Sequence, residues 1–302
     1  METLNNIVLT IQNYMSNYIL VIALLGAGLW FSIRLGFIQV RGFGESMRRT
    51  FGGLFSKKGE AGADGMSSFQ ALATAIAAQV GTGNIAGAAT ALAIGGAGAI
   101  FWMWIAAFLG MATIYAEAIM AQKYKTVGAD GQVTGGPVYY IRAAFKGTFG
   151  KVLAGIFAIL ITLALGFMGN AVQSNSIAAS FHTAFGIPQW IMGLVVAVIA
   201  IFVFMGGMKR IAKVTETIVP FMAALYIIGS LIVIIYNYKN IPYAFASIFI
   251  GAFSPSSVVG GAAGATVKLA LTKGVARGLF SNEAGMGSTP HAHAVAKVDH
   301  PV

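Results

Sequence analysis

The stretch Ala75–Gly87, which reads AIAAQVGTGNIAG, constrains the fold more than any other part of this chain. It lies inside an apolar segment long enough to cross a bilayer, yet Gly81–Asn84 interrupts that segment near its middle. Each interior glycine costs a helix about 1 kcal/mol relative to alanine. In hydrocarbon, a broken helix must turn its freed backbone groups toward a cavity or toward other protein. The pattern therefore predicts a broken membrane helix that faces a ligand, with close helix packing by small residues as the alternative interpretation.

Apolar runs of membrane-spanning length recur along the whole chain. Hydrophobic residues make up 57% of it and charged residues only 9%, whereas soluble domains contain about 25% charged residues. The sequence therefore predicts an all-α polytopic membrane protein, with residues 1–302 forming a single transmembrane domain. Residues 1–16 are expected to be a polar lead-in. The expected spans and tail are residues 18–40, 67–94, 99–122, 152–181, 189–208, 214–236 and 243–263, and a cytoplasmic tail at 264–302, which is judged too polar to span.

The basic residues of the chain gather on one side of these spans. Of the 19 lysines and arginines, alternation of the spans places all except Lys239 on the same side. This is the positive-inside pattern, and it predicts a plasma-membrane protein, or an inner-membrane protein in a Gram-negative cell, with its N-terminus outside. It also explains the net charge of +10 through contact with the lipid bilayer, without a nucleic-acid partner.

A break in a membrane helix offers bare N–H groups to an anion and free carbonyls to a cation. That chemistry suits a sodium-coupled carrier of zwitterions. A second interruption is expected at Gly251–Pro255, in the span 243–263, and it would begin a second unit of opposite topology. The chain contains no cysteine, and no acid, base and nucleophile cluster at the predicted cavity, so we do not expect an enzyme.

Three motifs resemble the alanine or glycine:cation symporter family, also called the sodium:alanine symporter family. They are Gly81–Gly87 (GTGNIAG), Gly278–Gly285 (GLFSNEAG) and Asp299–Val302 (DHPV). The resemblance implies a leucine-transporter-like inverted-repeat fold with one extra N-terminal helix. This chain would supply the first five-helix repeat and the first helix of the second, as an N-terminal portion of about two-thirds of a member. For Ser281, Asn282 and Glu283 the resemblance suggests a gating role.

The resemblance also assigns residues to ligands around the first break. The amides of Thr82 and Gly83 would hold the substrate carboxylate. The backbone carbonyls of Ala77 and Val80 would supply half of a Na⁺ site, since hard cations favour oxygen ligands. The Gln79 carbonyl and the Asn84 side chain would contact either the substrate or a second ion.

Two further groups are candidates for contact with the substrate. Asn170 and Gln173 lie three residues apart on one helical face, where they either bind substrate or bond to neighbouring helices. Phe249, Gly251 and Phe253 surround the second predicted break and either close the pocket over a small side chain or pack ordinarily. Glu117 is an acid within a span, but it lies near Lys123 and Lys125 at a cytoplasmic helix end. Structural pairing or solvation at the helix end is therefore expected in preference to a functional role.

The sequence thus predicts a symporter that couples Na⁺, or H⁺, entry to uptake of a small neutral amino acid such as alanine or glycine. It would use no organic cofactor and act as a monomer if the chain is completed. The alternative function is a truncated, transport-incompetent fragment, acting as a membrane scaffold or binding module.

Overall fold

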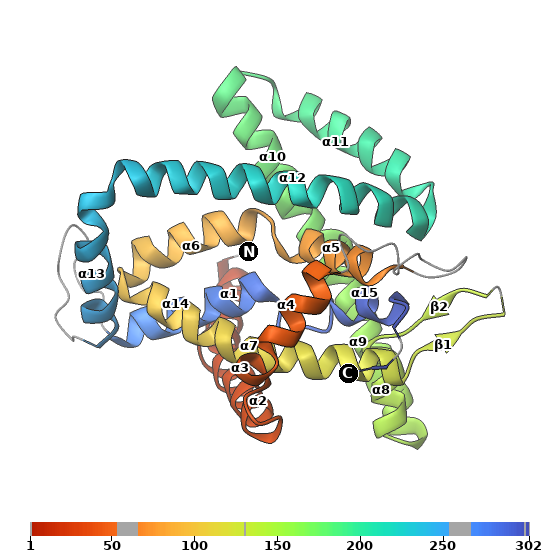
Figure 1. Ribbon diagram of the computed structural model, residues 1–302. Coiled ribbons are helices and arrows are strands. Elements are labelled where there is room, and N and C mark those ends of the chain that lie inside the picture. The colour runs from red at the N-terminus through yellow and green to blue at the C-terminus, as the bar shows by residue number, and fades with distance from the viewer. Residues whose placement is uncertain (1, 53–65, 130, 254–266, 299, 302) are drawn as a thin grey trace. The chain divides into compact units, whose positions relative to one another are not determined.

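The chain folds almost entirely as helices in a computed structural model that describes residues 2–52, 66–129, 131–253, 267–298 and 300–301 (Figure 1). It forms two compact units, and each is assembled from separate stretches of sequence. The first unit contains Met1–Glu45, Gly83–Ala116 and Ala224–Met286. The second unit contains Ser46–Thr82, Glu117–Ala223 and Gly287–Val302.

The N-terminal part of the chain is helical from its second residue, although a polar lead-in was the expectation for residues 1–16. Its elements are α1 (Glu2–Tyr14), the π-helical turn η1 (Met15–Ile19), α2 (Leu20–Arg34), α3 (Ile38–Arg41), α4 (Phe43–Gly52), α5 (Ser68–Gln79), α6 (Thr82–Gly95) and α7 (Gly98–Lys123). Ser67 begins α5 with a capping box, because its hydroxyl accepts from the Gln70 amide while the Gln70 side chain accepts from the Ser67 amide.

A short hairpin and further long helices complete the described chain. These elements are β1 (Thr126–Val127), β2 (Val133–Thr134), α8 (Pro137–Ala144), α9 (Gly147–Ile161), the π-helical stretch η3 (Thr162–Gly169), α10 (Asn170–Phe185), α11 (Gln189–Phe204), α12 (Gly207–Tyr236), the 3₁₀ turn η4 (Tyr238–Asn240), α13 (Ile241–Phe253), α14 (Val267–Asn282) and α15 (Pro290–Val295). β1 pairs with β2 in antiparallel register, with Thr126 opposite Thr134.

Three helical runs of the described chain are long and apolar enough to cross a membrane: Gly98–Lys123, Gly147–Phe185 and Gly207–Tyr236. Leu20–Arg34 and Gln189–Phe204 are shorter apolar helices. Large apolar side chains on these helices are exposed, such as Trp190 at 72% and Phe202 at 66%. Lipid tails cover such surface without cost, so this exposure agrees with an integral membrane protein.

The first unit packs through small residues. Gly274 and Gly278 of α14 lie four residues apart, and a methyl group on Gly278 would come within 3.0 Å of the Ala106 Cβ of α7. Gly274 meets Ala99 and Trp102 earlier on α7, so α7 and α14 run in parallel. Glycine at this spacing allows helix backbones to approach closely in membranes.

α6 runs alongside α14 in the opposite direction (Figure 1). Near its end, a methyl group on Gly95 would lie 3.4 Å from the Ala270 Cα at the beginning of α14. Near its beginning, Gly83 meets Phe280 at the end of α14. The two helices are therefore antiparallel along their length.

Candidate functional site

The helix break predicted at Gly81–Asn84 lies at Val80–Gly81 in the structure, and residues 82–84 already belong to the next helix. α5 ends at Gln79, Val80 adopts an extended conformation with φ −93° and ψ 98°, and α6 begins at Thr82. The first amides of any helix have no partner within that helix. The donor end of α6 therefore lies at the break, where it exposes the backbone N–H groups of Thr82, Gly83 and Asn84. The positive end of the helix dipole lies at the same place.

Gln173 from α10 contacts this break within the second unit. Its Oε1 atom accepts from the Thr82 backbone N–H at 3.2 Å and from the Thr82 hydroxyl at 3.0 Å. A methyl group on Gly81 would overlap the Gln173 amide, so glycine is required there for this contact. The structure thus joins Thr82 and Gln173, two residues that the sequence proposed for the site.

The Asn170 side chain has a different hydrogen-bond partner from that of Gln173, although both were predicted to lie on one helical face. The Asn170 side chain is exposed and donates to the Gly166 carbonyl of its own helical run at 3.0 Å. The structure therefore brings Gln173 to the break but not Asn170.

Asn84 contacts the end of α14 within the first unit. Its Nδ2 atom donates to the Ser281 hydroxyl at 2.6 Å and to the Ser281 carbonyl at 3.2 Å. A methyl group on the neighbouring Gly83 would lie 2.8 Å from Cε1 of the Phe280 ring. The beginning of α6 is thus fixed against the last residues of α14.

The end of α5 makes a corresponding contact within the second unit. The Gln79 side chain donates to the hydroxyl of Thr289 at 3.2 Å, and Thr289 is only 3% exposed. Thr289 directly precedes α15. At the other end of α5, the Met66 amide donates to the Val295 carbonyl at 3.1 Å. α5 and α15 are therefore also antiparallel.

The structure contains a second helix break that the sequence prediction missed. α14 ends at Asn282 and α15 begins at Pro290. Between them Glu283, Gly285 and Gly287 take positive φ angles of 54°, 83° and 78°. The Asn282 side chain accepts from the Ala284 amide at 2.9 Å. Asn282–Thr289 is thus an interruption with two glycines two residues apart, the spacing that also marks the first break.

The prediction of a break at Gly251–Pro255 was wrong for its described part. α13 continues as helix through Gly251 and Phe253, and residues 254–266 lie outside the described residues. A methyl group on Gly251 would come within 2.8 Å of the Gly98 amide nitrogen. Gly251 therefore permits close contact between α13 and the beginning of α7.

Phe249 and Phe253 pack against the same end of α7. Their ring centroids lie 5.7 Å and 5.0 Å from that of Phe101. This cluster adjoins the turn between α6 and α7, whereas Gly83 lies at the opposite end of α6, about 20 Å away at 1.5 Å per residue. The structure therefore does not bring Phe249, Gly251 and Phe253 to the first break.

The atoms proposed for Na⁺ are backbone carbonyls of Ala77 and Val80. The extended conformation of Val80 turns its carbonyl away from the direction followed by the carbonyls of α5. Carbonyl oxygens are hard ligands of the kind that Na⁺ prefers. These two groups therefore fit the ion by donor type.

A clamp that the sequence did not predict holds the C-terminal end of α15 in the second unit. The side chain of Gln122, 9% exposed at the end of α7, donates to the carbonyls of His293, Ala294 and Ala296. Lys125 donates to the Gln122 Oε1 atom at 2.7 Å and to the Ala296 carbonyl at 3.4 Å. Gln122 and Lys125, the α15 clamp hereafter, satisfy carbonyls that a helix end leaves without internal partners.

Two acids within the spans, Glu216 and Glu117, face neighbouring elements of the second unit. Glu216 accepts from the Gln70 side chain at 3.0 Å, which joins α12 to the capping box of α5. Glu117 is 7% exposed. The pKa of Tyr140 on α8 is raised by burial and, to a smaller extent, by the charge of Glu117, so this carboxyl faces α8.

The pH dependence of stability should reveal the partly buried ammonium of Lys125 in the clamp. Burial lowers the pKa of Lys125 below its ordinary value of 10.5, so the unfolded chain binds this proton more tightly than the folded chain. The free energy of unfolding therefore rises as the pH rises from the lowered pKa to above 10.5. Lys125→Met removes this contribution, so the stability of the wild type relative to the variant should increase as the pH rises toward and past 10.5.

Thermal unfolding of the purified chain in detergent, followed by tryptophan fluorescence, measures this difference. Lys151→Met, at an exposed position of α9, is the matched control and should keep a constant offset from the wild type. A constant offset for Lys125→Met as well would contradict the buried-ammonium explanation.

Comparison with known proteins finds relatives along the whole chain. A sequence profile described as the sodium:alanine symporter family matches residues 1–302. The sodium/alanine symporter AgcS of Methanococcus maripaludis is 44% identical over 298 residues, which cover 98% of this chain and 64% of that protein. The amino-acid carrier protein AlsT of Bacillus subtilis is 45% identical over 279 residues, covering 92% of this chain and 57% of AlsT.

A third relative carries a different substrate in its name. The probable sodium/glutamine symporter GlnT of Bacillus subtilis is 42% identical over 301 residues, which cover 100% of this chain and 60% of GlnT. The chain thus spans between 57% and 64% of the length of these relatives.

Proposed function

This chain belongs to the sodium:alanine symporter family, and from that premise we propose that it couples Na⁺ entry to the uptake of a small neutral amino acid across the plasma membrane. It is an integral membrane protein of a transporter family and not an enzyme. Alanine and glycine are the proposed substrates, although one relative is named for glutamine. H⁺ is the alternative coupling ion.

The observation that carries this proposal is the pair of helix breaks and the contacts that join them. Residues on both sides of the first break, Gln79 and Asn84, bond to residues on both sides of the second, Thr289 and Ser281. Irregular backbone at membrane depth is tolerated where it lines a cavity or a ligand site. Interrupted helices in corresponding positions of two repeats are the best sequence pointer to a transporter site.

The directions of the broken helices support an inverted-repeat, leucine-transporter-like fold. α6 is antiparallel to α14, and α5 is antiparallel to α15, as the first helices of two inverted repeats would be. We therefore propose α14–α15, rather than the span 243–263, as the first helix of the second repeat.

This assignment changes the proposed membrane topology at one place. With the N-terminus outside, α7 runs from outside to inside, and α14 runs parallel to it. Lys268, near the beginning of α14, would then lie outside with Lys239, and Lys273 and Arg277 would lie within the span. The other basic residues keep the positive-inside pattern. Lys297, after α15, stays inside.

Substrate recognition would use the donor end of α6. The amides of Thr82 and Gly83 suit a carboxylate, because helix N-termini attract anions. In the structure the Gln173 carboxamide oxygen accepts from Thr82, and a carboxylate oxygen is an acceptor of the same kind. We therefore propose that the substrate carboxylate replaces Gln173 at Thr82, and that Gln173 then turns to another polar group of the substrate.

The coupling ion would act at the other side of the same break. Carbonyls of Ala77 and Val80 would bind Na⁺, and Gln79 and Asn84 would contact the substrate or a second ion. An ion that fixes the end of α5 favours the conformation in which α6 presents its amides. Such coupling between two ligands is typically worth about 1–3 kcal/mol.

Uptake of radiolabelled alanine into proteoliposomes tests this function. An inward Na⁺ gradient should raise the initial rate about fivefold or more over a matched K⁺ gradient, given that coupling free energy. Equal rates in Na⁺ and K⁺ would refute sodium coupling, and a sodium-free proton gradient then tests H⁺. Alanine binding without uptake in either gradient would instead support the second candidate, a membrane-embedded binding module.

A further inference from the structure

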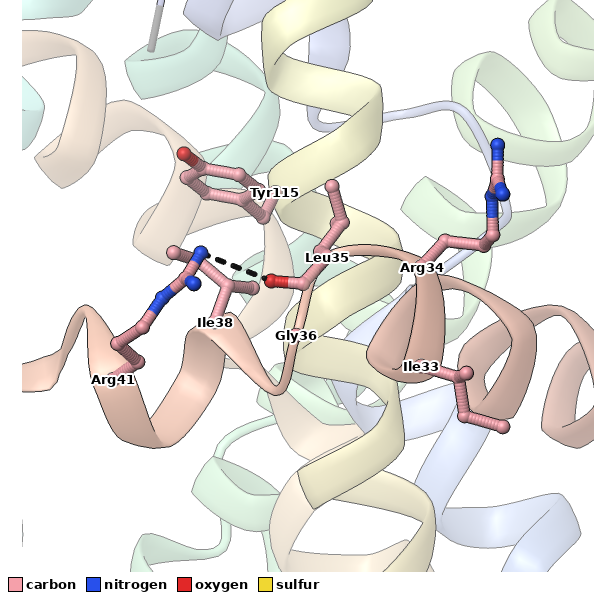
Figure 2. Close-up of a pocket in the computed structure, with 7 residues that line it drawn as sticks. All are labelled: Ile33, Arg34, Leu35, Gly36, Ile38, Arg41 and Tyr115. Atoms are coloured by element: carbon pink, nitrogen blue, oxygen red, sulfur yellow. Dashed lines mark hydrogen bonds between the residues drawn. The ribbon is translucent and has the colours of Figure 1, made fainter.

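A hollow of about 390 Å³ lies on the surface of the first unit at the turn between α2 and α3 (Figure 2). Arg34, Gly36 and Arg41 line it from the turn, and Tyr115 lines it from α7. None of the residues proposed for amino-acid transport lines this hollow. It is therefore a separate feature of the molecule.

The shape of the turn places Arg41 over the hollow. Gly36 and Phe37 take left-handed conformations with φ of 60° and 50°, which reverse the chain directly after α2. Arg41 then reaches back and donates through one Nη to the Leu35 carbonyl at 3.3 Å. A guanidinium carries five N–H donors in a fixed fork, so this one bond leaves Arg41 able to donate to a further acceptor.

Charge and hydrogen-bond donors dominate the hollow. Figure 2 shows Arg41 and Tyr115 on one side of the turn and Arg34 on the other. Among the residues that the structure describes, the lining contains two arginines, one tyrosine and no acidic residue. A forked guanidinium and a phenol hydroxyl both suit a phosphate, which accepts several hydrogen bonds and carries negative charge.

Exposed apolar side chains surround the same turn. Trp30, Ile33 and Phe37 are 62%, 58% and 45% exposed. The Arg34 guanidinium lies 5.7 Å from the Trp30 ring centroid, which is a cation–π contact. Tryptophan is enriched at the level where hydrocarbon meets water. A phosphate in the hollow would thus have apolar surface directly beside it for acyl chains.

We propose that this hollow binds the headgroup phosphate of an anionic phospholipid of the inner leaflet. Arg41 and Tyr115 would donate to the phosphate, Arg34 would add positive charge, and the acyl chains would lie along Trp30 and Phe37. Basic pockets beside membrane helices on the cytoplasmic side attract anionic lipids in this way. The inner leaflet rests on the topology given under the proposed function, whereas the lipid site itself does not depend on transport.

Native mass spectrometry of the full chain, released from nanodiscs of equal parts phosphatidylglycerol and phosphatidylcholine, tests the proposal. The wild type should retain phosphatidylglycerol in preference to phosphatidylcholine. The double variant Arg41→Gln with Tyr115→Phe should retain it about tenfold less, since one charged hydrogen bond is worth about that factor. Arg142→Gln, which removes an equal charge from an exposed position of α8, should retain as much as the wild type.

Each result decides the question without a transport measurement. Equal retention by the double variant and the wild type, or equal retention of both lipids by the wild type, would overturn the proposal. Displacement of phosphatidylglycerol by millimolar inorganic phosphate would also overturn it, because the site would then bind free phosphate. Retention that is lost in the double variant and unaffected by inorganic phosphate would establish the lipid as the ligand, even if alanine uptake fails.

Discussion

A leucine in place of Gly83 is expected to reduce alanine uptake about tenfold to a hundredfold, while the chain still inserts into the membrane. A methyl group at this position would already lie 2.8 Å from the Phe280 ring, and leucine adds three more carbon atoms. Overpacking of this kind costs about 1–3 kcal/mol, which corresponds to that range of affinity. This steric strain arises at the beginning of α6, where the Gly83 amide is proposed to hold the substrate carboxylate.

Gly229→Leu is the matched control. Gly229 is an exposed glycine within α12, and nothing lies within 4 Å of a methyl group built there. It should insert and transport like the wild type. Gly83→Ala should fall between Gly83→Leu and the wild type, because the Phe280 ring has room to shift for one methyl group. Full uptake by Gly83→Leu would show that the beginning of α6 does not hold the substrate.

The first helix break could be predicted from sequence because its cause is local. Gly81 and Gly83 weaken the helix within an otherwise uninterrupted apolar segment, and the apolar flanks make the interruption visible. The second break has the same local cause, since Gly285 and Gly287 are also two residues apart. It could not be recognised as a break in a span, because the polar residues of α14 made the segment before it appear too polar to cross a membrane. The paired glycine spacing was the signal that could have found it.

The contacts of the site could be predicted only in part. Helical spacing placed Asn170 and Gln173 on one face, but only the Gln173 side chain bonds to the break, while Asn170 bonds to the Gly166 carbonyl of its own helical run. Phe249 and Phe253 were assigned to the site through a predicted break that the described part of α13 does not contain. Whether an aromatic side chain packs against other helices or contacts a substrate depends on tertiary contacts, and the periodicity of the sequence does not predict these contacts.

The α15 clamp was beyond sequence reasoning because it joins residues about 170 positions apart, and side chain to backbone bonds leave no residue pattern at the acceptor. Gln122 looked like an ordinary polar residue at a helix end, and Lys125 like one more cytoplasmic charge. In the structure the two side chains meet the last carbonyls of α15. Their contribution is therefore best judged by removing one of them.

Gln122→Leu is expected to lower the free energy of unfolding by about 2–4 kcal/mol, because leucine fills a similar volume but donates to nothing. Buried carbonyls of α15 would lose their donor, and each unsatisfied polar group costs about 1–3 kcal/mol. For a chain of this size the unfolding temperature should fall by about 3–6 °C. Thermal unfolding in detergent, followed by tryptophan fluorescence, measures the change.

The control for this substitution is Gln189→Leu, at the exposed first residue of α11. This variant should unfold within about 1 °C of the wild type, because surface substitutions rarely change the free energy of unfolding by more than about 0.5 kcal/mol. Gln122→Glu separates the two halves of the clamp. It keeps an acceptor for Lys125 but removes the donor to α15 and places a carboxylate against carbonyl oxygens, so it should destabilise at least as much as leucine at neutral pH. If both Gln122 variants unfolded like Gln189→Leu, the end of α15 would be held by its bonds to Met66 rather than by Gln122.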